Sequence, residues 1–271
     1  MDWTQITLLI GIGFFIGFVG TLIGAGGGFM LTPILLLIYP SMRSEAITSI
    51  SLGVIFLNAG SGSIAYARMK RIDYRSALAF ALATLPGAVM GAFLTSYIPR
   101  TTFNILLGLL LIIISFFLLV KPHYERISKK KGQQSLTHRI LNDSKGQHYE
   151  YSFNLWTGVI ISFFVGFLSS LLGIGGGIIH VPALTALLNF PVHIATATSH
   201  LILAIMALTG TIVHIFQGDL KEGWASILYI GIGVIGGAQL GAYSSHHIKP
   251  KWIIRALALA LLLVGIRIIF I

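Results

Sequence analysis

The stretch that decides the fold is Gly24-Ala25-Gly26-Gly27-Gly28, and the chain repeats it as Gly173-Ile174-Gly175-Gly176-Gly177. Each glycine costs about 1 kcal/mol relative to alanine in a helix interior, so neither run stays helical cheaply. Both runs lie inside apolar stretches, and each is followed by a proline, Pro33 or Pro182. The sequence therefore predicts two helices that break at these glycines.

The two runs belong to a longer internal duplication. Gly17-Phe18 aligns with Gly166-Phe167, a shift of 166 − 17 = 149 residues, and Thr48-Ser49 aligns with Thr198-Ser199 after one inserted residue. A repeat of this kind is typical of an array of similar structural units. We expect a first membrane repeat over 1–121, a basic cytoplasmic linker over 122–152 and a second membrane repeat over 153–271.

Composition places the chain in a lipid bilayer. Of its 271 residues, 55% are hydrophobic and only 10% are charged, whereas about a quarter of an average soluble domain is charged. Apolar stretches of the roughly 20 residues that span a bilayer recur at about 45–68, 75–97, 102–120, 194–217, 225–246 and 253–270. We predict an all-α polytopic membrane protein, built from two repeats of about four helical elements. The first apolar run lacks a basic leader, so we expect a membrane segment and not a signal peptide.

Loop charge predicts how the repeats are inserted, because cytoplasmic loops are rich in Lys and Arg. The loop at 68–75 and the linker at 121–152 are both basic and are two spans apart, so both are expected in the cytoplasm. In the second half the basic loop is 246–251, whereas 219–222, which matches 68–75, is not basic. Equivalent loops thus carry opposite charge bias, which favours inverted repeats.

Inversion requires an odd number of crossings in each half. Three full spans, preceded by an element that dips in and returns over about 5–39 and 154–190, would satisfy it and place both termini outside. The alternative is a first element that crosses once. Four spans in each half, parallel repeats and both termini inside would then follow.

The glycine runs are candidates for an anion site. A helix N-terminus after a break presents unpaired N–H groups and the positive end of the helix dipole. The carboxylates all fall at expected helix ends or loops, whereas a cation pump usually needs one within the membrane. We therefore expect a small anionic substrate, bound by Gly24, Gly26, Gly27, Gly28, Thr48, Ser49, Asn58, Gly173, Gly175, Gly176, Gly177, Thr198, Ser199 and His200. The alternative for glycine is close helix packing, which we favour for the pairs Gly13/Gly17, Gly20/Gly24, Gly87/Gly91, Gly233/Gly237 and Gly237/Gly241.

Three histidines lie inside apolar runs of the second half: His180, His200 and His214. A histidine whose hydrogen bonds are satisfied in the protein interior is one interpretation. Coupling of transport to protons is another. Metal ligation is the least favoured, because no thiolate or carboxylate lies near them in sequence and the chain has no cysteine.

Other classes of protein are excluded by context. The net charge of +10 comes from short loops and one linker, not from the basic face of a soluble nucleic-acid-binding domain. The glycine runs lack the third spacing of a dinucleotide-binding motif, follow no predicted strand and precede no Gly-Lys-Ser/Thr. Neither a nucleic-acid partner nor a bound cofactor is expected.

The repeated Gly-x-Gly-Gly-Gly run, the proline after it and the Ala-x-Thr-Ser stretch closely resemble the sulfite exporter TauE/SafE family. The resemblance covers both halves outside the linker. It implies an inverted-repeat bundle in the plasma membrane that transports sulfite, a sulfonate or a related small sulfur-containing anion, and no enzyme activity. The second half departs from the first in reading Thr196-Ala197-Thr198-Ser199-His200, so the site need not be symmetric. A passive anion channel and a histidine-based, metal-dependent intramembrane enzyme are the alternatives.

Overall fold

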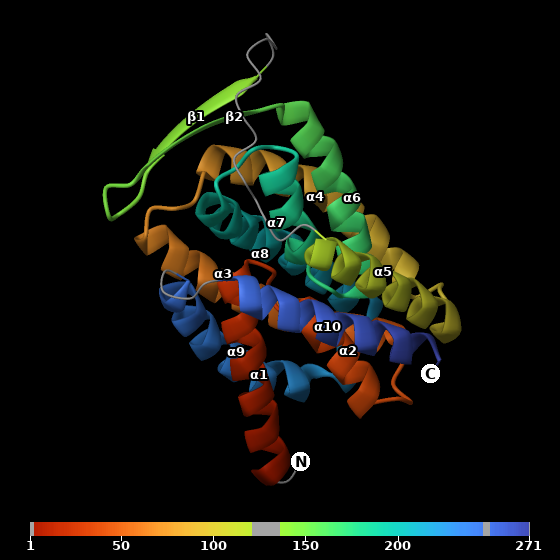
Figure 1. Cartoon of the computed structure of the whole chain (residues 1–271). Helices are drawn as coiled ribbons and strands as arrows, with labels where there is room; N and C mark the ends of the chain where they lie inside the picture. Colours follow the sequence, from red (N-terminus) through yellow and green to blue (C-terminus); the bar gives the residue numbers. More distant parts are fainter. Residues whose placement is uncertain (1–2, 121–135, 246–249, 271) are drawn as a thin grey trace.

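The computed structural model describes residues 3–120, 136–245 and 250–270. The first half contains five helices: α1 (Trp3–Ile23), α2 (Gly28–Ile38), α3 (Ser44–Arg68), α4 (Tyr74–Thr95) and α5 (Arg100–Val120). The second half contains α6 (Leu155–Leu172), α7 (Gly177–Ala186), α8 (Val192–Gln217), the short 3-10 helix η1 (Asp219–Glu222), α9 (Trp224–Ser244) and α10 (Pro250–Ile269). Between them lie two short strands, β1 (Thr137–Asn142) and β2 (His148–Phe153) (Figure 1).

The helices confirm the expected all-α polytopic membrane protein. Within the described residues, seven helices are long and apolar enough to cross a bilayer: α1, α3, α4, α5, α6, α8 and α9. The expected last span at 253–270 corresponds to α10. The two helices that follow the glycine runs, α2 and α7, have 11 and 10 residues and are too short to cross.

Both glycine runs break the chain as predicted. In the first run Gly24, Gly26 and Gly27 have φ values of +86°, +72° and +79°, and in the second Gly173 and Gly175 have +63° and +67°. Residues with a Cβ rarely adopt this left-handed region, so glycine is required for the turn from α1 into α2 and from α6 into α7. Pro33 and Pro182 each occupy the sixth position of the helix after the break.

The element formed by α6 and α7 returns to the end of the molecule from which it starts. It begins directly after β2, and the segment after α7 comes back to β2, because the Phe190 ring lies 4.9 Å from that of Phe153 and 4.5 Å from that of Tyr151. We call this end, formed by residues 69–73, the two strands and residues 187–191, the hairpin end.

The element formed by α1 and α2 starts and returns at the other end. The glycines of α1 and α9 show that these helices run parallel, since Gly13 approaches Ile230 and Gly17 approaches Val234. The start of α9 follows η1, where Asp219 Oδ1 lies 3.9 Å from Arg43 Nη2 in the loop after α2. We call this end, formed by residues 39–43 and 218–223, the Arg43 end. Figure 1 shows α1 and α6 starting at opposite ends of the molecule.

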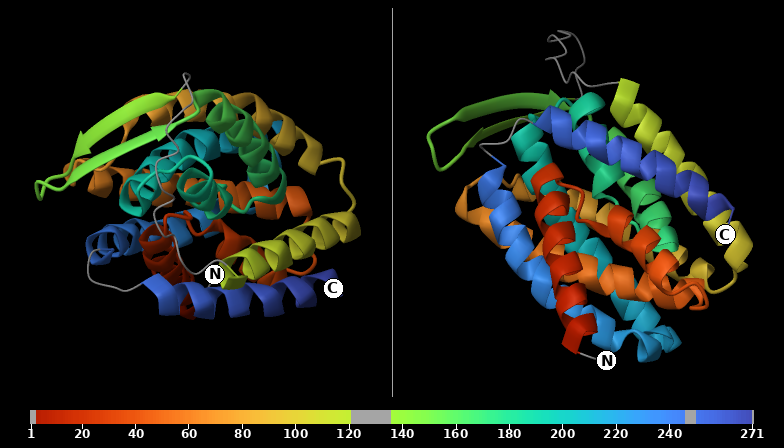
Figure 2. Two further views of the ribbon diagram at one scale, coloured as in Figure 1. Left: turned by 45° about the horizontal axis from the view of Figure 1, so that its top comes forward. Right: turned by 60° about the horizontal axis from the view of Figure 1, so that its bottom comes forward.

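The two halves are interleaved. In space α1 packs along α9 and α6 packs along α4, so each broken helix lies against a helix of the other half. The remaining helices pair with their counterparts, α3 with α8 and α5 with α10, and Figure 2 shows α5 and α10 side by side.

Glycines make the close approach of these helices possible. A Cβ at Gly237 would strike Phe14 O, and one at Gly87 would strike Phe163 O. Phe163 is Phe14 shifted by 163 − 14 = 149 residues, so the two contacts correspond in the two halves. The prediction that the spaced glycine pairs serve helix packing is confirmed for Gly13/Gly17, Gly87/Gly91, Gly233/Gly237 and Gly237/Gly241, each of which meets backbone of the neighbouring helix.

The linker contributes an antiparallel hairpin of β1 and β2 that covers one end of the helices. Asp143 in its turn and Arg71 in the loop before α4 form a buried ion pair, with side chains 1% and 2% exposed and Arg71 Nη2 3.4 Å from Asp143 Oδ2. Burial raises the pKa of the Asp143 carboxyl, but N–H donors from Gln147 and Lys145 and the guanidinium outweigh it, so this pKa lies below its ordinary value.

A second carboxylate, Asp73, joins the hairpin to the start of α4. Its Oδ2 accepts a hydrogen bond from Tyr151 Oη at 2.8 Å and lies 3.4 Å from Arg139 Nε. Burial, and then the Asp73 charge, raise the pKa of the Tyr151 phenol. The basic loop at 68–75 and part of the linker therefore lie at one end, as the charge argument requires. The basic residues at 121–135 and 246–249 lie outside the described residues.

Candidate functional site

The two glycine breaks meet in the interior of the molecule. A Cβ at Gly177 would lie 2.5 Å from Gly24 O and 2.8 Å from Ala25 Cα. Conversely, a Cβ at Gly28 would lie 2.7 Å from the carbonyl carbon and oxygen of Ile174. All ten residues of the two runs are buried. The fold thus brings two segments that are 149 residues apart in sequence into backbone contact.

Each break leaves a helix N-terminus with unused donors. The N–H groups of Gly28 and Phe29 at the start of α2 find no acceptor within the described part of the chain. At the start of α7, the N–H groups of Gly177 and Ile178 likewise have no acceptor among the residues that the structure describes. Buried donors of this kind are costly unless a ligand or water satisfies them, and the helix dipole makes an anion the preferred ligand.

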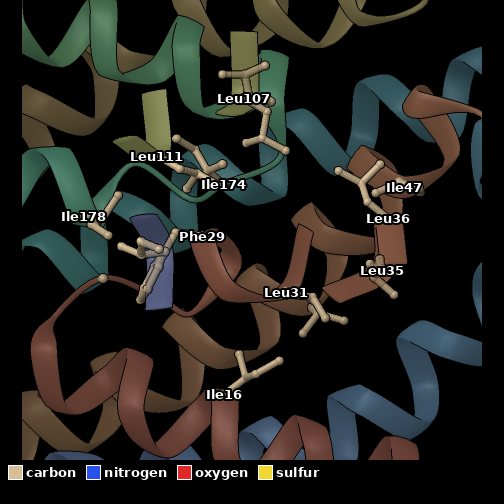
Figure 3. Packing of buried hydrophobic residues seen from close by; sticks show 14 of the residues in the cluster. Ile16, Phe29, Leu31, Leu35, Leu36, Ile47, Leu107, Leu111, Ile174 and Ile178 are labelled. Atoms are coloured by element: carbon tan, nitrogen blue, oxygen red, sulfur yellow. The ribbon is translucent and has the colours of Figure 1, made fainter. Parts of the chain in front are cut away.

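Apolar side chains cover the place where the breaks meet. Ile55 of α3 contacts Gly28 and Gly175, and Leu203 of α8 contacts Gly26 and Gly177. Figure 3 draws the neighbouring cluster, in which Phe29, Ile174 and Ile178 from the breaks join Leu107 and Leu111 of α5. The backbone donors are therefore shielded from solvent by side chains from both halves.

Several interior side chains donate to carbonyl groups that the breaks expose. Thr32 Oγ1 and Ser51 Oγ both donate to Gly173 O at 2.5 Å, and Asn58 Nδ2 donates to Gly26 O at 2.8 Å. Thr21 Oγ1 in turn donates to Asn58 Oδ1 at 3.2 Å. These groups satisfy one carbonyl in each break. The amide of Asn58, which we expected to bind the anion, serves as a cap.

Hydroxyl groups without partners gather at the second break. Thr48 Oγ1, Ser169 Oγ and Ser170 Oγ are buried and form no hydrogen bond with any described residue. Thr48 Cγ2 would lie 3.2 Å from a Cβ at Gly173, and Ser169 Oγ 3.5 Å from one at Gly176, the residue before α7. Ser170 Oγ lies 3.2 Å from the corresponding position of Gly210 on α8. The free hydroxyl of Ser169 therefore lies beside the residue that precedes α7, whereas Thr48 contacts the break through its methyl group and Ser170 faces α8.

The structure separates other residues that the sequence grouped together. Ser49 Oγ donates within its own helix to Ala46 O and lies 3.5 Å from Asp219 O, at the Arg43 end. Thr198 Oγ1 accepts from the N–H of Asp73, at the hairpin end. Ser199 Oγ is buried and has no partner among the residues the structure describes. The aligned Thr-Ser pairs thus do not form one site.

The three interior histidines have different surroundings. His180 Nε2 lies 3.0 Å from Ser162 Oγ, and its ring faces Phe80. His200 packs edge-on against Tyr66 and beside Gly62. His214 Nδ1 lies 2.9 Å from Asp219 Oδ2. Only His214 of the three is paired with a carboxylate.

Carboxylates lie at the ends of the helices, as expected. Glu45 is in the first turn of α3, Asp73 caps α4, and Asp219 starts η1. Within residues 3–120, 136–245 and 250–270, no three His, Cys, Asp or Glu side chains come together as a metal-binding group. The charge pattern around the breaks favours an anion over a cation.

The candidate residues chosen from the sequence do not include Thr32, Ser51, Ser169 or Ser170, nor Ile55 and Leu203. The duplication was the signal used to select residues, and Ser169-Ser170 aligns with Gly20-Thr21, which is not a serine pair. A count of hydroxyls near each glycine run would have found Ser169 and Ser170.

Comparison with known proteins gives one consistent match. The family model described as Sulfite exporter TauE/SafE matches residues 9–268. The probable membrane transporter protein YunE of Bacillus subtilis is 33% identical over 270 residues, covering 97% of each chain. A probable membrane transporter protein of Methanocaldococcus jannaschii is 28% identical and covers 90% of this chain and 88% of its own. No solved structure gives a significant match.

Proposed function

Because the chain belongs to the sulfite exporter TauE/SafE family of membrane transporters, we propose that it carries a small sulfur-containing oxyanion, such as sulfite or an organosulfonate, across the membrane. The substrate binds where the two glycine breaks meet. The observation that carries this proposal is the pair of buried helix N-termini whose first N–H groups lack acceptors in the described structure. Two such ends in backbone contact form a concentrated anion site.

Within this site, we assign the oxyanion to the second break. The N–H groups of Gly177 and Ile178 point the positive dipole end of α7 at it, and the hydroxyls of Ser169, Ser170 and Thr48 supply further donors. A sulfite or sulfonate group has three oxygens and accepts several hydrogen bonds at once, which matches a mixture of N–H and O–H donors.

Transport requires the site to open to each end of the molecule in turn. The two broken elements enter from opposite ends, which supports inverted insertion and alternating access. Because each broken helix packs on the other half, the moving units are the pairs α1/α9 and α4/α6 and not the sequence halves. Ile55 and Leu203 cover the breaks, so both must move before an anion enters.

The test is sulfite binding by the double variant S169A/S170A, measured in detergent as the rise in melting temperature that sulfite produces. A ligand at 100 times its Kd stabilises the folded state by about 2.7 kcal/mol, which a thermal scan detects. The variant is expected to lose most of that rise. Its melting temperature without sulfite is expected to stay the same or rise, because the deleted hydroxyls have no described partner.

A matched control is S115A, which removes a serine hydroxyl that joins α5 to α10. Ser115 Oγ donates to Ala258 O between α5 and α10. The control is expected to lower stability by about 0.5–1.5 kcal/mol yet keep the full response to sulfite. If S169A/S170A keeps that response too, the assigned site is wrong.

A carrier and a passive channel differ in exchange. In proteoliposomes, a carrier that alternates between two ends is expected to take up labelled sulfite faster when unlabelled sulfite is inside. Uptake that ignores the internal anion would favour a channel. If neither sulfite nor methanesulfonate is bound or moved, the proposed function itself is overturned.

A further inference from the structure

The end of α8 at the Arg43 end contains a histidine–carboxylate pair that the anion site does not explain. The ring of His214 is 0% exposed, and its Nδ1 lies 2.9 Å from Asp219 Oδ2, whose side chain is 7% exposed. An ionised carboxylate only accepts hydrogen bonds, so Nδ1 carries the hydrogen in this pair. The lone pair of the neutral ring is therefore on Nε2, which is buried without a hydrogen bond to any described residue. That atom is the place where an added proton binds.

The charges around His214 favour its protonation. Asp219 pairs with it directly, and Glu45 of α3 and Arg43 from the loop before α3 lie beside Asp219, with Arg43 Nη1 2.9 Å from Glu45 Oε1 and Nη2 3.9 Å from Asp219 Oδ1. Lys221 on η1 is exposed. Arg100 at the start of α5 belongs to the same group, since its Nη1 donates to Met42 O at 2.9 Å and its charge interacts with that of Glu45. With His214 neutral, the two carboxylates and two guanidiniums sum to zero, and Asp219 is the carboxylate in direct contact with the ring. That contact favours the protonated ring at this buried position.

The packing of α3 on α8 places His214 one turn from the second break. The helices run antiparallel, because Gly62 meets His200 and Leu52 meets Gly210. Residues four apart lie on the same face of a helix. Thr48, four residues before Leu52, and His214, four residues after Gly210, are therefore expected to face each other as well. Thr48 touches the second break at Gly173. Asp219, His214 and Thr48 therefore follow one another from the Arg43 end to the second break.

The other two histidines have no carboxylate partner. His180 Nε2 lies beside Ser162 Oγ, and His200 Nδ1 beside the carbonyl of Thr196 in its own helix. The Nε2 atom of His200 is also buried without a described hydrogen bond, so the pairing with Asp219 is what sets His214 apart. His214 is also connected to the surface through Asp219, because Arg43, which lies 3.9 Å from that carboxylate, is 56% exposed.

We propose that His214, positioned by Asp219, is the proton-binding site that couples anion movement to protons. In the cycle, Nε2 takes a proton from the aqueous side of the Arg43 end, the imidazolium balances the charge of an anion in the second break, and the same proton leaves when the anion does. This inference rests on the proposed function, because it needs an anion at that break.

The experiment uses purified protein in liposomes with methanesulfonate, an anion that stays fully ionised at neutral pH, so that any proton moved is carried by the protein. Two rates are measured: exchange of internal for external methanesulfonate, and net accumulation driven by a pH gradient. H214Q is expected to lose gradient-driven accumulation by tenfold or more and to lose less of the exchange, which needs no net proton movement. The matched control H180Q is expected to keep both.

The outcomes separate the two proposals. If wild-type protein exchanges methanesulfonate but a pH gradient drives no accumulation, or if H214Q still accumulates it, the proton site is wrong and the function stands. If the wild-type protein exchanges neither methanesulfonate nor sulfite, the proposed function is wrong as well.

If H214Q does not insert into the membrane, the variant D219N tests the proton site instead, because it keeps the hydrogen bond to His214 but removes the negative charge. We expect D219N to shift the acid limb of gradient-driven transport to lower pH, and an unchanged profile would contradict the proposal.

Discussion

The two glycine breaks have nearly the same sequence but different polar surroundings. At the first break, the amide of Asn58 caps Gly26 O, and Thr21 and Tyr66 continue that network to the backbone. At the second, Thr32 and Ser51 cap Gly173 O, and three further hydroxyls remain without described partners. Side chains therefore cap one carbonyl in each break, but the two breaks differ in the hydroxyls that lie around them. The two halves share the broken-helix geometry, and the side chains in which they differ decide where an anion can bind.

The largest effect is expected from what the breaks share, their direct contact. In G177A the added methyl group meets Gly24 O and Ala25 Cα, which are backbone atoms that cannot rotate away. Overpacking of this kind costs about 1–3 kcal/mol, so we expect a lower melting temperature and a loss of sulfite exchange of about tenfold or more. G28A should behave alike, because its methyl group meets Ile174.

The matched control for this change is G60A. Gly60 lies in the middle of α3, and no atom lies within 4 Å of its Cβ position. Alanine favours a helix interior over glycine by about 0.5–1 kcal/mol, so this variant is expected to keep exchange and gain stability. Equal losses in G60A and G177A would show that contact between the breaks is not what matters.

The next effect distinguishes capping from anion binding at the first break. N58L removes the donor to Gly26 O and the acceptor for Thr21 Oγ1, leaving two buried polar groups unsatisfied. We expect a loss of about 1–3 kcal/mol of stability for each, with little change in sulfite affinity of the folded protein. Chemical unfolding gives the first quantity and a sulfite titration the second. If N58L instead has the stability of the wild type and binds sulfite much more weakly, Asn58 contacts the anion and is not only a cap.

A smaller effect is expected at the second break, because Gly173 O has two donors. In S51A the hydroxyl of Thr32 still donates to that oxygen at 2.5 Å. The loss of stability should therefore stay at about 1 kcal/mol or less. Chemical unfolding of S51A beside N58L measures the difference directly, and a larger loss in S51A would mean that Thr32 alone does not satisfy the carbonyl.

These contrasts show what the sequence could and could not predict. The breaks, their membrane setting and their role in bending the helices follow from glycine runs in apolar stretches, and all are confirmed. The partners of the hydroxyls do not follow, because Thr32 donates to a carbonyl 141 residues away. Alignment of the halves also misled the choice of residues. Thr198 aligns with Thr48, yet it accepts a hydrogen bond from Asp73 at the hairpin end. Tertiary packing decides which hydroxyls are used.

The smallest effect is expected from pH at the hairpin end, in contrast to the Arg43 end. Because the pKa of Asp143 is lower in the folded protein than in an unfolded chain, its ion pair with Arg71 contributes stability above the ordinary aspartate pKa of about 3.9. That contribution disappears as pH falls through the lower, folded value. Amide exchange of the hairpin at 137–153, corrected for the intrinsic pH dependence of exchange, is therefore expected to stay constant from pH 5 to 8.

Over the same range, gradient-driven anion transport should change, because the proposed cycle protonates His214 and the ordinary histidine pKa of about 6.5 lies within that range. The two ends of the molecule thus differ in their response to pH for a physical reason: one buried ion pair contains arginine, which stays charged, and the other contains histidine, which does not. If hairpin exchange rises between pH 8 and 5 together with a change in transport, proton binding acts through the hairpin end, and the contrast between the two ends fails.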